Sequence, residues 1–150
     1  MSERYNFYKS APGGTKLMLD MEKYLHECGI EESLIHLVKM RASQINGCAY
    51  CLDMHSRDAR EKGETEQRLY VLDAWRETEL FTPRERAALA WTEALTLISQ
   101  THAPDAVYSE VNAQFSGAEL ANLTLLIATI NTWNRIAIST RMPIPAQKAA

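Results

Sequence analysis

The segment from residue 116 to about residue 139 limits the possible folds more than any other part of the chain. It opens with SGAE, a serine followed three residues later by a glutamate, which is the capping-box pattern of a helix start. Its apolar side chains fall on more than one face of the expected helix: Leu120, Leu123, Leu125, Leu126, Ile127, Ile130, Trp133 and Ile136. A helix that is apolar over most of its circumference lies at the centre of a core or between subunits. The sequence therefore predicts a helical protein built around this segment.

The rest of the chain also carries helical signals. Helices are predicted over about 15–27, 31–45, 48–63, 65–77, 82–99 and 104–115, and no stretch shows the two-residue alternation of a strand. Residues 82–85, TPRE, form a second capping box with proline at the first helical position. The Asn46-Gly47 dipeptide separates two helices, because glycine readily takes a positive φ. We expect one all-α domain over residues 1–150 with six to seven helices, a core at about 15–140, an irregular lead-in over 1–14 and a loose tail from Pro143.

Length, charge and cysteine content set the class of protein. A chain of 150 residues is long enough to bury one sizeable core. The net charge of −3, with scattered signs, leaves no basic stripe, which argues against nucleic acid as a partner. The first ten residues lack the apolar core of a secretory signal, and the longest apolar run, near residues 123–130, is too short to span a bilayer. Three cysteines in a chain without a signal favour a reducing compartment, so we expect a cytoplasmic protein with no membrane association.

The stretch INGCAYCLDMHSRDAR carries the residues with the most chemistry, which are Cys48, Cys51 and His55. On a helix these side chains share one arc with Leu52 and Ala59, so they point inward or into a cleft. Cys51 lies one turn from His55 and one turn from Cys48, and the cysteine spacing allows a disulfide. Both cysteines lie in the first turn, where unpaired N–H groups lower the pKa of a thiol, and a nearby imidazole lowers that pKa further or takes the proton. This is the makeup of a thiolate nucleophile with a resolving partner.

Two other interpretations of the cysteine pair stay open on the residues alone. Free cysteines are often buried as small apolar core residues. A zinc site is the other interpretation, with Cys48, Cys51 and His55 as ligands and His36, His26 or Cys28 as the fourth. Closed zinc sites usually take their ligand pairs from separate elements, and this chain has no second Cys-x-x-Cys and no His-x-x-x-His, which counts against zinc.

The segment LIHLVKMRASQINGCAYCLDMH, residues 34–55, resembles the core of the AhpD-like alkylhydroperoxidases of the carboxymuconolactone decarboxylase superfamily. The resemblance is closest over residues 31–62, and the helical remainder, including TINTWNRIAIST, looks like the short single-domain members. It implies an antioxidant cysteine peroxidase in which Cys51 attacks the peroxide, Cys48 resolves the product as a disulfide, and His55 assists proton transfer. It implies no metal, haem or other cofactor.

The resemblance also implies substrates, a reductant and an assembly. The substrate would be hydrogen peroxide or a small organic hydroperoxide, the reductant a lipoyl-bearing or thioredoxin-like protein, and the assembly a homotrimer or homohexamer. One position departs from the family pattern, because the AhpD proteins carry a relay glutamate twelve residues before the first cysteine and this chain has His36 there. A histidine can carry a proton near neutral pH, and its charge would favour a thiolate. The helical wheel also groups His36 with Lys39 and Ser43, away from the apolar arc, where a solvated residue would lie.

Three alternative functions follow from these observations. The first is a decarboxylase or lactone-processing enzyme of the same superfamily, which works with acid–base residues and needs no cysteine pair. The second is a thiol–disulfide oxidoreductase or redox sensor without peroxidase turnover. The third is a zinc-stabilised interaction module.

Arg41 falls inside the apolar arc of its predicted helix. A buried arginine must be paired, because an isolated charge in an apolar environment is costly. We therefore expect a carboxylate from another helix or subunit beside Arg41, in a structural role.

Overall fold

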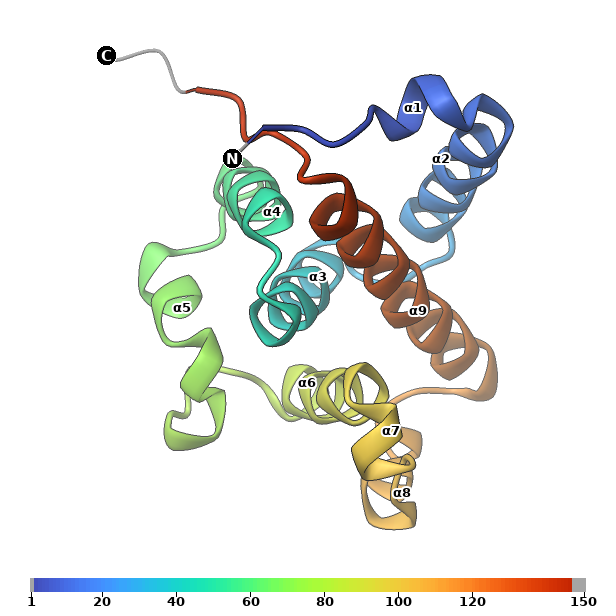
Figure 1. Ribbon diagram of the computed structural model, residues 1–150. Coiled ribbons are helices and arrows are strands. Elements are labelled where there is room, and N and C mark those ends of the chain that lie inside the picture. Colours follow the sequence, from blue (N-terminus) through green and yellow to red (C-terminus); the bar gives the residue numbers. More distant parts are fainter. Residues whose placement is uncertain (1, 147–150) are drawn as a thin grey trace.

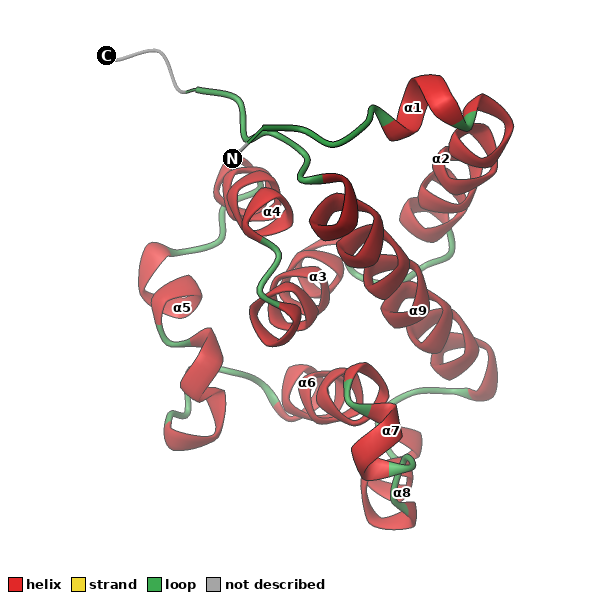
Figure 2. Cartoon of the chain, viewed as in Figure 1, coloured by secondary structure: helices red, strands yellow, loops and turns green. Residues whose placement is uncertain are grey.

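The computed structural model describes residues 2–146, which form one all-α domain. This part of the chain contains ten helical segments and no strand (Figure 2). In chain order they are α1 (Phe7–Ser10), α2 (Pro12–Glu27), α3 (Glu32–Asn46), α4 (Ala49–Glu61), α5 (Glu66–Tyr70), the 3-10 helix η1 (Leu72–Glu77), α6 (Pro83–Thr96), α7 (Ile98–Thr101), α8 (Asp105–Asn112) and α9 (Gly117–Thr140). The all-α prediction is confirmed, whereas the expected six to seven helices are too few. Within the tail predicted to be loose, residues 143–146 are irregular, and residues 147–150 lie outside the described part.

Helix α3 lies at the centre of the domain and packs against α4, α6 and α9 (Figure 1). Helix α9, the longest at 24 residues, crosses the molecule and also contacts α2, α4, α6 and α8. Its central place agrees with its apolar sequence, since Leu123, Leu126 and Ile130 are fully buried. The helices that flank the cysteine pair therefore rest on the most extensively packed part of the protein.

Local capping signals set the ends of several helices. Both predicted capping boxes are present: the hydroxyl of Thr82 accepts the Glu85 N–H at the start of α6, and that of Ser116 accepts the Glu119 N–H at the start of α9. In each box the glutamate side chain accepts the N–H of the capping residue in return. Gly47 ends α3 with a φ of 68°, a left-handed conformation that glycine adopts without a side-chain clash. These boundaries are therefore readable from short sequence signals.

Three predicted boundaries are wrong. Residues 2–14 are not an irregular lead-in, because α1 forms and α2 begins at Pro12, where the fixed φ of proline suits the first turn of a helix. The helix expected over 65–77 is divided into α5 and η1, and Ala74 within η1 lies outside helical geometry (φ −107°, ψ 28°). The helix expected to reach residue 99 ends at Thr96, and α7 follows as a separate short segment. These short segments explain why the helix number exceeds the prediction.

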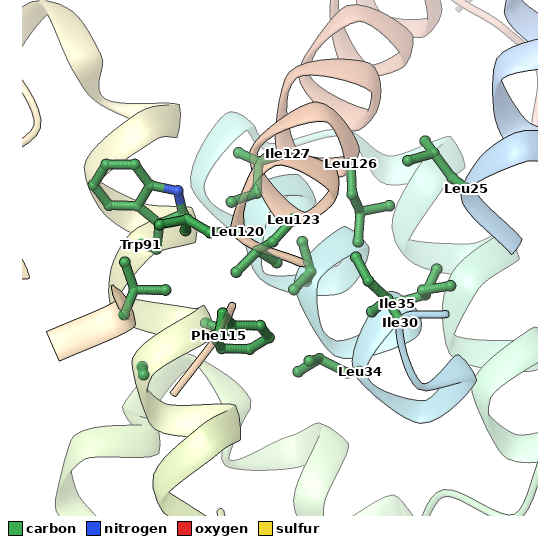
Figure 3. Packing of buried hydrophobic residues seen from close by; sticks show 14 of the residues in the cluster. Leu25, Ile30, Leu34, Ile35, Trp91, Phe115, Leu120, Leu123, Leu126 and Ile127 are labelled. Carbon is green, nitrogen blue, oxygen red and sulfur yellow. The ribbon is translucent and has the colours of Figure 1, made fainter. Parts of the chain in front are cut away.

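Two large apolar clusters hold the helices together. The first joins α2, α3, α6, α8 and α9, and Figure 3 shows Trp91 and Phe115 beside Leu120 and Leu123 of α9. The second joins α3, α4, α5, η1 and α6, and includes Leu37, Leu72, Trp75, Phe81 and Leu89. Burial of apolar side chains of this size stabilises a fold by about 1.5–3 kcal/mol each. None of the helices within residues 2–146 is long and apolar enough to cross a bilayer.

Arg41 pairs with carboxylates from two other elements of the same chain, as its position predicts. Its Nε donates to Glu93 Oε1 on α6 at 2.8 Å, and its guanidinium also pairs with Asp73 on η1. Glu93 accepts a further hydrogen bond from Trp75 Nε1 at 2.8 Å and pairs with Arg76. The network joins α3, η1 and α6, so the charge of Arg41 is balanced within one subunit.

Candidate active site

The cysteine pair lies where α4 begins, against the last part of α9. The N–H of Cys48 donates to the Ser43 carbonyl at 3.0 Å, directly after the Gly47 turn that reverses the chain between α3 and α4. Cys48 is the N-cap residue of α4, and Cys51 lies in its first turn. Both thiols are free, and the two residues are only 1% and 2% exposed and pack with Ala137 of α9. The inward-facing arc expected for this segment is therefore observed.

A hydrogen bond between the two thiols shifts their pKa values in opposite directions. The Cys51 thiol donates to the Cys48 sulfur, and this contact, with the backbone N–H groups of Cys51 and Tyr50 and the Asn134 amide, lowers the pKa of Cys48 to about 7. The same hydrogen bond, together with burial, raises the pKa of Cys51. The hydrogen bonds to Cys48 thus favour a thiolate at the start of α4, where helix N–H groups also stabilise negative charge.

A set of hydrogen-bonded polar side chains from α3 and α9 lies beside the cysteine pair. Asn134 of α9 donates to Ser43 Oγ at 3.0 Å, and its carbonyl oxygen accepts from Asn46 Nδ2 at 2.8 Å. Asn46 Nδ2 also donates to Asn131 Oδ1 at 2.9 Å. Asn134 and Ser43 are fully buried. These residues are not among the predicted site residues, although two asparagines three apart in a mostly apolar helix are a signal that could have indicated them.

His55 lies one turn after Cys51 and is almost fully buried. Its Nδ1 has no hydrogen-bond partner among residues 2–146, and the nearest carboxylate oxygen is that of Asp58, at 3.7 Å. Burial, reinforced by the positive charge of Lys39, lowers the pKa of His55 to about 3. At neutral pH the side chain is therefore a neutral imidazole, with one nitrogen that donates and one that accepts a proton.

His36 is buried, so the alternative of a solvated surface residue is wrong. It is 5% exposed, and neither ring nitrogen has a hydrogen-bond partner among residues 2–146. Its ring lies 6.5 Å from that of His26 on α2, between ring centroids. Burial lowers its pKa, so His36 is also neutral near pH 7. The residue does not line the pocket beside Cys51, although its charge state influences His55.

Cys51 and His55 line one pocket of about 250 Å³. Its apolar wall consists of Tyr8, Leu19, Met54, Trp133, Ala137 and Met142. Tyr8 belongs to the unexpected helix α1, and its ring centroid lies 6.4 Å from that of Trp133 on α9. The N-terminal residues, predicted to be irregular, thus complete the pocket.

The polar wall of this pocket contains an ion pair. Lys39 Nζ lies 2.6 Å from Glu22 Oε2, and the two side chains are 3% and 20% exposed. Lys39 comes from α3 and Glu22 from α2, so the pocket is formed where the four helices α2, α3, α4 and α9 meet α1. His26 and Asp58 complete the polar side. The Lys39–Glu22 pair cannot be recognised from the sequence, because a lysine on the polar arc of a helix is usually solvated.

A second hollow, of about 330 Å³, lies on the side of Cys48. Its further lining includes Gly47, Ala49, Ile138, Arg141 and Ile144. Tyr50, Ala137 and Met142 line both hollows and so separate them. The two sulfurs of the pair thus line different hollows.

The zinc arrangement left open by the sequence is not formed in the described part of the chain. Within residues 2–146, no three His, Cys, Asp or Glu side chains are grouped so that they could hold one metal ion. Cys28, a possible fourth ligand, instead contacts the Leu25 carbonyl through its sulfur at 3.2 Å.

Comparison with known proteins gives the family. Residues 12–94 match the carboxymuconolactone decarboxylase family. YdfG of Bacillus subtilis (strain 168), an uncharacterized protein, is 47% identical over 139 residues, which cover 93% of this chain and 95% of YdfG. YnjA of Escherichia coli (strain K12), also uncharacterized, is 33% identical over 111 residues, which cover 74% of this chain and 59% of YnjA.

Solved structures agree with this assignment. The crystal structure of ATU0492 from Agrobacterium tumefaciens, a protein of unknown function for which a role as the antioxidant defence protein AhpD has been suggested, superposes with a TM-score of 0.94. It is 42% identical, and the match covers 97% of this chain and 100% of that one. The debrominase Bmp8 has the same fold, with a TM-score of 0.80 at 20% identity over 92% of this chain and 74% of its own. This protein is an AhpD-like member of the carboxymuconolactone decarboxylase family.

Proposed function

We propose that this protein is a thiol peroxidase that reduces hydrogen peroxide or small organic hydroperoxides through the Cys48–Cys51 pair. One observation carries the proposal: Cys51 of a Cys-x-x-Cys pair lines a pocket together with a buried neutral histidine, while Cys48, the N-cap residue of α4, has a lowered pKa. Family membership and the likeness to ATU0492 support a peroxidase-related role.

The first chemical step takes place at Cys51, which lines the pocket. After the pair has lost one proton, the remaining proton moves along the S–H···S hydrogen bond to Cys48 and leaves a thiolate on Cys51. This thiolate attacks the terminal oxygen of the peroxide, so that an S–O bond forms and the O–O bond breaks. His55, with one donating and one accepting nitrogen, relays a proton to the departing oxygen. The products are a sulfenic acid on Cys51 and water or an alcohol.

The second step closes the disulfide. The Cys48 sulfur, one helical turn away, displaces hydroxide from the Cys51 sulfenic acid, and the hydroxide leaves as water after protonation. A dithiol reductant then attacks one sulfur of the disulfide and passes through a mixed disulfide before both cysteines are released. We assign the attacked sulfur to Cys48, because the hollow that it lines is separate from the peroxide pocket. The reductant in this proposal is a lipoyl-bearing or thioredoxin-like protein of the cytoplasm.

Thiol titration tests the function directly. The reduced protein is mixed with one equivalent of peroxide under anaerobic conditions, and free thiols and mass are measured. We expect two thiols per chain to be lost with a mass decrease of two hydrogens, while Cys28 stays free. Unchanged thiols with every peroxide tried would refute the proposal.

The family name supports one second candidate, acid–base chemistry on a lactone or carboxylate substrate. The buried His55 and the Lys39–Glu22 pair could serve such a reaction without a cysteine pair. The protein with both Cys48 and Cys51 replaced by serine separates the two: a decarboxylase would keep its activity, and a thiol peroxidase would lose it entirely.

A closed homotrimer or homohexamer belongs to the same proposal. Apolar side chains remain exposed on α2 and α9, among them Leu19 at 53% and Ile138 at 46%. Symmetric assembly is the usual way to cover such surfaces in a small helical domain. Light scattering at micromolar concentration measures the assembly, and a monomer mass would contradict it.

A further inference from the structure

The Lys39–Glu22 ion pair has no role in the steps described so far. Its ammonium group is almost completely buried and lies 2.6 Å from Glu22 Oε2. A buried ion pair is weak support for a fold, because the cost of removing two charges from water often exceeds their attraction. The pair is therefore better explained by its position in the pocket wall than by stability.

Lys39 lies within electrostatic reach of the reacting groups. It lines the same pocket as Cys51 and His55, and its positive charge lowers the pKa of His55. The charged and titratable groups around it are Glu22 and His26 from α2, His36 from α3, and His55 and Asp58 from α4. Lys39 is the lysine that lines the pocket together with Cys51, and its ammonium group is held in place by Glu22.

The size and walls of the pocket indicate an organic substrate. Its volume of about 250 Å³ is several times the share of one water in the liquid, about 30 Å³. Hydrogen peroxide would leave most of this space to water. Opposite the polar groups, Tyr8, Leu19, Trp133 and Met142 offer an apolar surface on which a small aliphatic or aromatic body can pack.

We propose that the pocket binds a small organic hydroperoxide with its apolar body against Tyr8 and Trp133, and that the Lys39 ammonium, held by Glu22, stabilises the oxygen that departs when the O–O bond breaks. The inference rests on the thiol peroxidase function and names a further catalytic residue for it. Neither Lys39 nor Glu22 changes its oxidation state.

The chemistry assigns each group one task. The Cys51 thiolate forms the S–O bond and is oxidised by two electrons. The O–O bond takes up those electrons and breaks, and the oxygen bonded to carbon departs as an alkoxide. The alkoxide receives its proton through His55. A fixed positive charge beside the departing oxygen lowers the barrier, because negative charge develops there in the transition state. Lys39 thus supplies the electrostatic stabilisation, while Glu22 keeps its ammonium in place.

The inference is tested by comparing two oxidants whose leaving groups differ in basicity. The single-turnover rate of thiol oxidation is measured with tert-butyl hydroperoxide, whose alkoxide is strongly basic, and with peroxyacetic acid, whose carboxylate leaves without help. We expect Lys39→Met to slow the first reaction about 100-fold, the usual effect of removing one preorganised donor, and the second less than threefold. Lys39→Arg should restore most of the rate with tert-butyl hydroperoxide.

Two controls keep the result interpretable. Lys62→Met removes a lysine from an exposed ion pair with Glu32 on the surface and should leave both rates unchanged. If Lys39→Met does not fold, the double variant Lys39→Met, Glu22→Gln removes both charges and should show the same selective loss.

Equal losses with both oxidants, or no loss, would overturn the inference. A wild-type protein that reacts with hydrogen peroxide but not with tert-butyl hydroperoxide also overturns it and leaves the peroxidase function intact, whereas no reaction with any peroxide overturns both.

Discussion

Asn134 on α9 donates a hydrogen bond to Ser43 Oγ on α3 at 3.0 Å, and the same amide contacts both sulfurs of the cysteine pair. Its carbonyl oxygen is occupied by Asn46. One fully buried side chain therefore joins the two central helices and also lowers the pKa of both thiols, in addition to the larger effect of the hydrogen bond between them. The cysteine pair and the packing of the domain are linked through this residue.

Replacing Asn134 by leucine should affect both properties. The fully buried Ser43 hydroxyl would lose its donor, which costs about 1–3 kcal/mol, whereas Asn46 would keep its hydrogen bond to Asn131. Denaturant unfolding should show a loss of this order. The Cys48 thiolate would lose one donor, so its pKa should rise above about 7. The pH profile of iodoacetamide alkylation measures that shift. Thr132→Leu, on the exposed side of α9, is the control and should change neither quantity.

His55 should make the protein sensitive to acid in a defined pH range. Its folded-state pKa of about 3 lies below the ordinary value of 6.5, so between these two values the unfolded chain binds a proton that the folded protein does not. The contribution of His55 to the free energy of unfolding is fully present above pH 6.5. It decreases by about 1.4 kcal/mol for each pH unit as the pH falls towards 3. The unfolding free energy of His55→Gln should decline less steeply between pH 6.5 and 4.5. Parallel curves for the two proteins would show that the imidazole does not stay neutral.

The roles of the two sulfurs can be read from trapped intermediates. Cys48→Ser should react once with peroxide and stop at a sulfenic acid on Cys51, which dimedone labels. Cys51→Ser should not give that adduct, although its Cys48 thiol can still form mixed disulfides with small thiols. Mass spectrometry of the labelled peptides locates the adduct. Labelling of Cys48 in the second variant, without labelling of Cys51 in the first, would reverse the two roles.

The two hollows should be separable by mutation. Leu19→Trp narrows the hollow of Cys51, and Ile138→Trp narrows that of Cys48, because each of these side chains lines only one of the two hollows. We expect the first variant to slow oxidation by tert-butyl hydroperoxide at least tenfold and to leave reduction by dihydrolipoamide unchanged. The second should do the opposite. Disulfide for the reduction assay can be prepared with diamide, so that the two half-reactions are measured independently. Equal effects on both would mean that the hollows communicate.

Much of the fold follows from local signals in the sequence. The starts of α6 and α9 are specified by Thr82 and Ser116 with a glutamate three residues on, and the end of α3 by Gly47, so each boundary depends on neighbours along the chain. The start of α2 was missed, because Gly13 and Gly14 have low helix propensity and only tertiary contacts favour a helix there.

The candidate site was predicted only in part, because the sequence reveals neighbours on one helix but not contacts between helices. Cys48, Cys51 and His55 lie on one helix, where the spacing of 3.6 residues per turn decides which side chains meet. Lys39 and Glu22 come from different helices, and polar residues such as His36 look solvated until the packing of α2 against the rest is known. Tyr8 enters the pocket through a helix that the sequence did not indicate.

The position of Cys48 at the start of α4 has a thermodynamic consequence for the redox couple. The N–H groups of Tyr50 and Cys51 stabilise an anionic sulfur, and that anion exists only while the pair is reduced. Disulfide formation removes the charge and leaves those donors with a weaker acceptor. Because the protein stabilises the dithiol state in this way, its reduction potential should be higher than that of a disulfide between ordinary thiols. In the proposed peroxidase cycle mild dithiols would reduce such a disulfide readily, so the helix start itself would favour return to the dithiol state.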